Sequence, residues 1–301
     1  MSKLVVVGSS NTDLVVRVPA IPVPGETVLG DEMRIVPGGK GANQAVAAAR
    51  LGAQVCFVGC IGTDSFGEGA IQNLTREGID IHYVVRTDRH PSGVALITVS
   101  PQGENAIVVA PGANMHLRPE HIERAEPAIA RADAVVAQLE VPLETVEAAA
   151  RLAKRHRVPF ILNPAPACPL HPDLLRMIAV LIPNEAEARQ LTGAGSEVGE
   201  EAMLQVLMEQ GCPRVVITLG ARGAIYNTES EIHRQPALHV QAVDTTAAGD
   251  AFVAGFTVAL TEGSSMHEAV RFGQRVAAIA VTRWGAQPSL PTRKEVEQFA
   301  P

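Results

Sequence analysis

The strongest constraint on the fold is the alternation of short apolar runs with longer helical segments along most of the chain. The apolar runs have the length and composition of strands buried on both faces, and they span residues 4–7, 55–59, 134–137, 160–162, 180–182 and 215–219. The helical segments lie around them, at residues 42–51, 67–77, 119–131, 143–156 and 200–210. This alternation predicts an α/β fold with a Rossmann-like, mainly parallel sheet flanked by helices on both faces.

Two stretches interrupt the alternation, because they contain strand-like segments with no helix between them. These segments span residues 14–18, 26–33, 82–86, 93–99 and 105–109, and a turn at residues 100–103 joins the last two. We therefore expect a small antiparallel sheet, formed by residues 14–36 and 82–109, inserted into an α/β domain of residues 1–13, 37–81 and 110–301. Such a sheet could be a lid over an active site or a structural edge, and composition does not decide between them.

Composition and charge argue against several functions. The net charge is −7, and the aromatic residues are seven Phe, two Tyr and one Trp, so neither a basic face nor a base-stacking surface for a nucleic acid is expected. The sequence shows no apolar run of membrane-spanning length and no signal-peptide pattern after Met1. The four cysteines have no zinc-site spacing. We expect a cytoplasmic protein with free thiols and with no nucleic-acid or membrane partner.

The segment Asp244-Thr-Thr-Ala-Ala-Gly-Asp250 runs directly into an apolar helix-forming stretch at residues 251–260. Its small residues leave backbone N–H groups free to face an anion at a helix start, where the helix dipole also favours negative charge. Asp250 within this turn could accept a proton beside a phosphate group, or it could simply be an acid favoured at a helix N-terminus. The local pattern leaves both interpretations open.

A second glycine-rich segment, Pro37-Gly-Gly-Lys-Gly-Ala-Asn-Gln44, precedes another predicted helix. Its glycines permit close approach of the backbone to a ligand, and Lys40 and Asn43 could donate hydrogen bonds to hydroxyl groups. The alternative is a glycine-rich turn with a solvated lysine. Neither the P-loop pattern nor the dinucleotide-binding glycine pattern is present in the sequence.

Polar residues follow the predicted strands at several points. Asn11 and Asp13 come after the first strand, Glu140 follows the strand at residues 134–137, and Asn184 and Glu187 follow the strand that ends at residue 182. In parallel α/β sheets, ligands bind at the carboxyl ends of the strands. A polyol requires such a set of polar groups, because each buried hydroxyl must find a hydrogen-bond partner.

Seven segments together resemble the ribokinase-like family of carbohydrate and nucleoside kinases, and they occur in the order GSSNTD, PGET, GGKGANQ, NPAP, PNE, TLGARG and DTTAAGD. With GAQPS near the end, the resemblance extends from about residue 5 to residue 289. It implies ATP-dependent phosphorylation of the 5-hydroxyl of D-ribose, which gives D-ribose 5-phosphate and ADP. The alternatives are a related kinase that acts on deoxyribose, fructose or a nucleoside, and a non-catalytic sugar-binding regulator.

The resemblance also implies a role for each motif. Asp250 would be the general base, and the sugar would be held by Asn11, Asp13, Gly39, Lys40, Asn43, Glu140 and Asp250 itself. An anion hole would be formed by the backbone of Ala247, Ala248 and Gly249. ATP would contact Asn184, Thr218, Leu219, Gly220, Ala221, Arg222, Gly223, Gly249 and Gln274.

The resemblance also implies that the protein binds two cations and forms a dimer. Mg²⁺ would lie near Glu187, and K⁺ would be surrounded by Asp244, Thr246, Ala280, Arg283, Gly285 and Ser289. Mg²⁺ usually takes few protein ligands, while backbone carbonyl oxygens can replace the hydration shell of K⁺. Lids in this family often pair between subunits, so a homodimer formed through the lid is expected.

Overall fold

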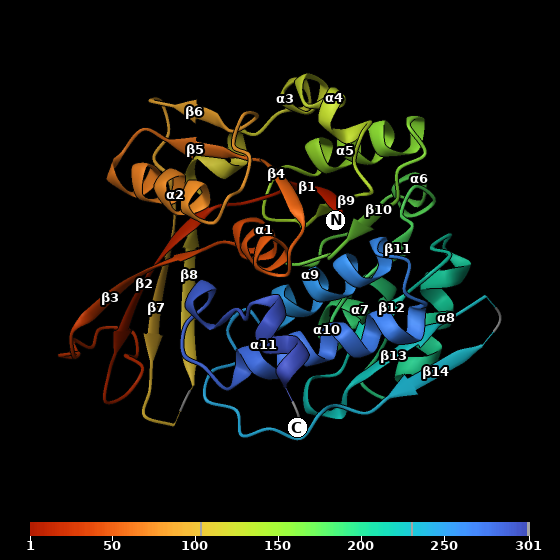
Figure 1. Ribbon diagram of the computed structural model, residues 1–301. Coiled ribbons are helices and arrows are strands. Elements are labelled where there is room, and N and C mark those ends of the chain that lie inside the picture. The colour runs from red at the N-terminus through yellow and green to blue at the C-terminus, as the bar shows by residue number, and fades with distance from the viewer. Residues whose placement is uncertain (103, 230, 300–301) are drawn as a thin grey trace.

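The computed structural model describes residues 1–102, 104–229 and 231–299. At its centre lies a five-stranded sheet with the order β11-β10-β9-β1-β4 (Figure 1). Its strands are β1 (Lys3–Val7), β4 (Gln54–Val58), β9 (Ala134–Ala137), β10 (Phe160–Leu162) and β11 (Val180–Leu181). Each pairing within this sheet is parallel, which confirms the predicted α/β fold.

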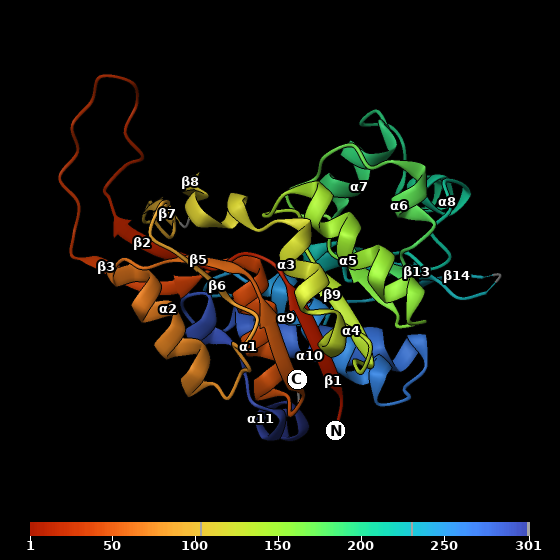
Figure 2. The same ribbon diagram turned by 90° about the horizontal axis from the view of Figure 1, so that it is seen from above.

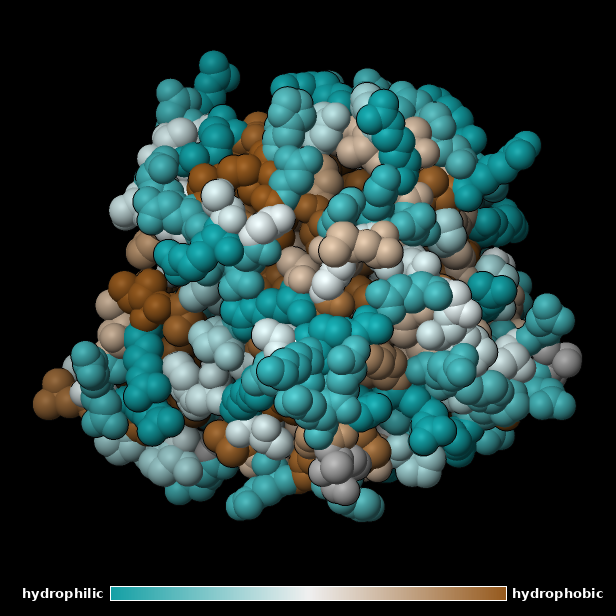
Figure 3. Space-filling view, viewed as in Figure 1, coloured by the Kyte–Doolittle hydropathy of each residue, from teal (hydrophilic) through white to brown (hydrophobic). Residues whose placement is uncertain are grey.

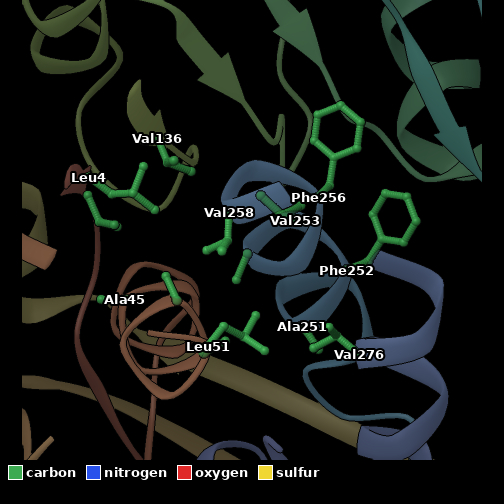
Figure 4. Close-up of a cluster of buried hydrophobic side chains, with 14 of the residues drawn as sticks. Leu4, Ala45, Leu51, Val136, Ala251, Phe252, Val253, Phe256, Val258 and Val276 are labelled. Atoms are coloured by element: carbon green, nitrogen blue, oxygen red, sulfur yellow. The ribbon is translucent and has the colours of Figure 1, made fainter. Parts of the chain in front are cut away.

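Helices cover both faces of the central sheet, because successive strand residues point to opposite sides. In β1, Leu4 and Val6 enter one hydrophobic core and Val5 and Val7 enter the other. The first core is formed with α1 (Lys40–Arg50), α2 (Ser65–Arg76), α9 (Ala248–Thr261), α10 (Met266–Val281) and α11 (Arg293–Gln298). Figure 4 shows this core between α1, α9 and the sheet. The second core is formed with α3 (Pro119–Arg124), α4 (Glu126–Ile129), α5 (Leu143–Arg155), α6 (Pro172–Leu175), α7 (Glu185–Thr192) and α8 (Glu200–Glu209).

Two small sheets extend this body. An antiparallel sheet is formed by β12 (Val216–Thr218), β13 (Ala224–Asn227) and β14 (Ile232–Gln235). Parallel bridges from Leu181 to Val215 and from Asn184 to Thr218 attach it beside β11. The strands β5 (Cys60–Gly62) and β6 (Val85–Thr87) pair with each other in parallel.

A separate four-stranded sheet stands at one side of the body, and we call it the inserted sheet (Figure 1). It has the order β3-β2-β7-β8, with β2 (Asn11–Arg17), β3 (Met33–Gly38), β7 (Gly93–Val99) and β8 (Asn105–Ala110). The outer pairings are antiparallel, as expected, but β2 and β7 are parallel. The reason is that the chain leaves the body twice, along β2 and along β7, and these two outgoing strands lie next to each other.

Three local predictions differ from the structure. Residues 26–32 are not a strand: they belong to the long connection from β2 to β3, which extends away from the body in Figure 2. The strand expected at residues 82–86 lies at Val85–Thr87 and pairs with β5 outside the inserted sheet. The helix expected at residues 119–131 is divided into α3 and α4, because Pro127 at the start of α4 has no N–H to continue the first helix. Gly103 of the expected turn lies outside the described residues. In the described part of the chain, no helix is both long and apolar enough to cross a membrane.

Candidate active site

The polar residues predicted at strand ends meet beside the N-termini of α1 and α9. Asn43 Nδ2 of α1 donates a hydrogen bond to Asp250 Oδ2 of α9 at 2.9 Å. Glu140, which follows β9, accepts hydrogen bonds at Oε2 from Ser9 Oγ at 2.5 Å and from the backbone N–H of Lys40 at 3.1 Å. The structure therefore brings an amide, a lysine and two carboxylates from three elements close together, and of these four residues Lys40 and Asp250 line a cavity.

Two glycines allow β2 to lie directly against the start of α1. Gly39 has φ +88°, and a Cβ atom there would lie 2.6 Å from the backbone nitrogen of Asn11. A Cβ atom at Gly38 would overlap the carboxylate of Asp13. Asn11 is fixed in turn, because its Oδ1 accepts a hydrogen bond from the buried Asn114 Nδ2 at 2.7 Å. The backbone thus holds both predicted sugar contacts of β2 in place.

The charges in this pocket perturb one another. Burial, together with the carboxylates of Glu140 and Asp250, raises the pKa of Asp13 to about 7. Burial also raises the pKa of Asp250, although Lys40 and hydrogen bonds from neighbouring amides oppose the increase. Burial opposes the charge of Lys40, but Asp250, Glu140 and Glu187 outweigh it and raise the pKa of Lys40. Lys40 therefore keeps its proton among these carboxylates. The raised pKa of Asp250 suits that carboxylate to proton transfer.

The turn before Asp250 forms the start of α9. The helix begins at Ala248, three residues before the expected residue 251, and Ala247 precedes it in the left-handed conformation with φ 59°. The N–H of Ala248 donates to Thr245 O at 3.2 Å, and the first intrahelical bond runs from Ala251 N to Ala247 O at 2.8 Å. The N–H groups between them, those of Gly249 and Asp250, belong to the first turn, where a helix provides no backbone acceptor. Such a helix start can bind an anion.

Two cavities meet at this turn. The larger, of about 330 Å³, is lined by the predicted nucleotide contacts Thr218, Gly220, Ala221, Gly223, Gly249 and Gln274, among others. The smaller, of about 190 Å³, is lined by Lys40, Asn184, Glu187 and residues 247–250, among others. Both are lined by Thr218, Thr245, Ala248 and Gly249. The helix start therefore lies between the larger cavity and the carboxylate of Asp250.

Two predicted nucleotide residues do not line either cavity. Leu219 is buried, and the guanidinium of Arg222 forms ion pairs with Glu185 and Glu200. The side chain of Arg222 thus ties the turn η2 (Gly220–Arg222) to α7 and α8.

Asn184 and Glu187 cap the N-terminus of α7 as well as lining the smaller cavity. Asn184 Oδ1 accepts from Glu187 N, and Glu187 Oε2 accepts from Asn184 N, both at 2.8 Å. Burial raises the pKa of Glu187. In the described residues, no three His, Cys, Asp or Glu side chains gather as a metal-binding group.

Asp244 joins the start of α9 to a second loop. Its Oδ1 accepts from Thr246 N and its Oδ2 accepts from Gly285 N, both at 2.9 Å. Trp284 belongs to this loop, and the guanidinium of Arg34 on β3 lies 4.5 Å from the centroid of its ring. The remaining predicted cation residues lie around the same loop, and their contacts are Arg283 N to Ala280 O at 3.0 Å, Arg283 Nη2 to Glu295 Oε1 at 2.6 Å, and Ser289 Oγ to Ala286 O at 2.7 Å.

Three buried amides that adjoin the site, those of Gln44, Gln138 and Asn163, were not among the predicted site residues. Gln44 Nε2 donates to Asp250 Oδ1 at 3.0 Å, and it also contacts Asn163 and Gln138. Gln138 directly follows β9 and Asn163 directly follows β10. The strand-end argument that selected Glu140 would have selected both of these residues.

Comparisons with known proteins agree with this geometry. The family model for pfkB family carbohydrate kinases matches residues 1–293. The chain is 47% identical over 300 residues to the ribokinase of Haemophilus influenzae, covering 98% of this chain and 97% of that protein. It is 42% identical over 299 residues to the ribokinase of Bacillus subtilis, covering 99% of each.

Solved structures show the same similarity in three dimensions. The ribokinase from Thermotoga maritima has a TM-score of 0.91 and 40% identity, over 99% of this chain and 98% of that one. The Arabidopsis thaliana ribokinase complexed with ribose and ATP has a TM-score of 0.91 and 35% identity, over 99% of each chain. Family model, sequence and fold thus agree along nearly the whole length, and the chain belongs to the pfkB family of carbohydrate kinases.

Proposed function

We propose that the protein transfers the γ-phosphoryl group of ATP to the 5-hydroxyl of D-ribose and releases D-ribose 5-phosphate and ADP. Similarity to ribokinases at 47% and 42% identity supports this reaction, as does the fold shared with a ribokinase complexed with ribose and ATP. The observation that carries the proposal is the position of Asp250. Its buried carboxylate lies beside Asn43 and adjoins the helix start at which the two cavities meet.

Different residues of the site would carry out different parts of the proposed reaction. Asp250 accepts the proton of the 5-hydroxyl as its oxygen attacks the γ-phosphorus. The N–H groups at the start of α9 donate to the charge that develops on the transferred phosphoryl group. Lys40 adds a positive charge where the carboxylates and the phosphate would otherwise repel one another.

The substitution Asp250→Asn tests the role of the base. It keeps the size of the side chain and removes the proton acceptor, so turnover should fall by about 10²–10⁴-fold while ribose affinity changes far less. Turnover is measured by ADP release, and affinity by calorimetry in the absence of ATP. Turnover close to that of the unaltered protein would show that another group accepts the proton.

The choice of sugar needs its own measurement. The deoxyribokinase of Salmonella typhi is 37% identical over 299 residues, so close relatives carry names for different sugars. We expect kcat/KM to be highest for ribose when ADP release is compared for ribose, 2-deoxyribose, fructose and a nucleoside. A higher value for deoxyribose would replace ribose as the substrate and would leave the kinase mechanism in place.

We propose that ATP is used with Mg²⁺ and that K⁺ supports the start of α9. Asn184 and Glu187 border the cavity that adjoins the helix start, so they would hold Mg²⁺ through its water shell, and the ion would offset phosphate charge. Asp244 ties the turn to the loop at Gly285, and backbone oxygens near this crossing suit K⁺. At saturating Mg²⁺, the rate of ADP release should rise as K⁺ is added and should rise much less when Na⁺ is added instead. Equal rates in both salts would remove K⁺ from the mechanism.

We propose that the inserted sheet, formed by β2, β3, β7 and β8, is a lid and also the surface through which two copies form a homodimer. Alternation along β2 places Asp13 on the pocket face and Leu14 on the opposite face. The register aligns Leu14 with Ile35, Leu96 and Val108, which are 56%, 52% and 64% exposed. These side chains form an apolar row across all four strands, and Figure 3 shows hydrophobic groups in brown at the margin where this sheet lies.

A second copy that covers this row would bury it and pair the exposed strand edges. Sedimentation is expected to give a dimer for the unaltered protein and a monomer for Leu96→Lys. A monomer at micromolar concentration before any substitution would remove the homodimer.

We also propose a cytoplasmic location. The four cysteines, Cys56, Cys60, Cys168 and Cys212, are free thiols in the structure. Free thiols suit the reducing cytoplasm, where sugar phosphates are made and used. Cell fractionation with an antibody to the protein tests this location.

A further inference from the structure

Gln44 contacts the proposed base directly, although the mechanism above gives it no role. Its side chain is 1% exposed and extends from α1, one residue after Asn43. Its Nε2 donates to Asp250 Oδ1 at 3.0 Å and to Asn163 Oδ1 at 3.1 Å. Its Oε1 accepts from Gln138 Nε2 at 2.6 Å. The amide therefore uses both of its hydrogens and its oxygen within the protein.

The neighbours of Gln44 determine which way its amide points. Asn163 Nδ2 donates to the backbone carbonyl of Ile182 at 2.8 Å, so Asn163 Oδ1 must face Gln44. Gln138 presents its Nε2 to the other side of Gln44. The contact with Asn163 requires Gln44 to direct its N–H groups toward Asn163 and Asp250, and the Gln44 oxygen then faces Gln138. Since Gln138, Asn163 and Ile182 directly follow β9, β10 and β11, the edge of the central sheet holds this amide in place.

Asn43, the second donor to the base, has fewer hydrogen bonds that fix the orientation of its amide. Its Nδ2 donates to Asp250 Oδ2 at 2.9 Å, while its own Oδ1 is buried without a hydrogen-bond partner in the described part of the chain. Nothing comparable to the sheet edge holds its orientation. The two oxygens of Asp250 thus differ: Oδ1 meets a donor whose orientation is fixed by Asn163, and Oδ2 meets a donor whose amide oxygen has no hydrogen-bond partner in the described residues.

We propose that Gln44 is a positioning residue that occupies Asp250 Oδ1 and leaves Oδ2 as the oxygen that accepts the substrate proton. The inference rests on the proposed kinase reaction and adds a residue to it. In that step the O–H bond of the sugar breaks and its proton binds Oδ2. The hydroxyl electron pair forms the new bond to the γ-phosphorus as the bond from phosphorus to the ADP oxygen breaks. Gln44 touches none of these reacting atoms.

The first test is the pH profile of Gln44→Met. Methionine has a similar length but cannot donate, so the ionised form of Asp250 loses one hydrogen bond. The acid limb of the kcat/KM profile should move upward by about one pH unit, with kcat reduced and KM for ribose little changed. The matched control is Gln138→Met, which removes a buried hydrogen bond one residue further from Asp250 and should move the limb far less. An acid limb that stays in place in Gln44→Met, or moves equally in both variants, overturns the proposal.

A second measurement needs no substrate. Carbon-13 NMR titration of the Asp250 carboxyl group, assigned by comparison with Asp250→Asn, should show a higher pKa in Gln44→Met. Should that variant not fold, Gln44→Glu places a second carboxyl group against Asp250 and should raise the pKa as well. An unchanged titration in the folded variants overturns the role of Gln44, whichever sugar the enzyme uses. A shifted titration in a protein that does not phosphorylate ribose would support Gln44 and remove the ribose assignment instead.

Discussion

Replacing Asp13 with asparagine is expected to reduce the pH dependence of stability of the ligand-free protein between pH 5 and pH 8. Burial, with the carboxylates of Glu140 and Asp250, raises the pKa of Asp13 from 3.8 to about 7. The folded protein therefore keeps a proton that the unfolded chain has released, so the free energy of unfolding falls as the pH rises through this range. From pH 5 to a pKa of about 7, at 1.36 kcal/mol per unit, the loss is on the order of 3 kcal/mol.

Urea unfolding at pH 5 and pH 8 measures this effect. The difference in the free energy of unfolding between Asp13→Asn and the unaltered protein should shift in favour of the variant by about 3 kcal/mol from pH 5 to pH 8. Asp250 and Glu187, whose pKa values are also raised by burial, leave a remaining dependence of the same sign in the variant. Asp88→Asn, at an exposed position, is the control. A difference that is constant across the two pH values would refute the electrostatic account of the pocket.

Gly8→Ala should lower the free energy of unfolding by about 1–3 kcal/mol, because a Cβ atom there would overlap a buried glutamine oxygen. Gly69→Ala, with no atom within 4 Å of its added Cβ, is the matched control. Equal unfolding midpoints for Gly8→Ala and Gly69→Ala would contradict the packing argument. Asp244→Asn replaces the carboxylate that accepts two backbone N–H groups and should abolish most of the activation by K⁺, while an unchanged K⁺ titration would separate this residue from the cation. Arg34 of the inserted sheet lies over the ring of Trp284, the only tryptophan, so closure of the proposed lid on ribose should change the fluorescence of Trp284. Arg34→Gln should remove that change, and a response that persists would show that the inserted sheet does not cause it.

The central sheet could be predicted because its strands are apolar on both faces, as Leu4 to Val7 illustrate. The edge of the inserted sheet could not. A strand is expected at residues 26–33, yet the segment that pairs with β2 is Met33–Gly38, which contains Pro37. A proline is tolerated there because β3 is an edge strand, and neither its position in the sheet nor its partner is visible in the local sequence.

The site was predictable where residues follow strands and unpredictable where it depends on contacts between distant elements. Asn43 and Asp250 were expected in one pocket, and the structure joins them by a hydrogen bond. Gln44 looks like any polar helix residue, because its burial results from packing of α1 against α9 and the sheet. The start of α9 was expected three residues too late, since an alanine such as Ala247 gives no sequence signal for a positive φ.

The strand β2 begins with the pocket residue Asn11 and continues to Arg17 in the inserted sheet, while β3 returns from that sheet and ends at Gly38 beside Asp13. No flexible linker separates the pocket from the sheet along these two strands. In the proposed closure, tilt of the sheet would be absorbed by bending of these strands, which would place the hinge in the backbone around Asp13 and Gly38. Residues that touch the sugar would then share their torsion angles with the closing movement, so that binding and closure form a single mechanical event with no relay between them.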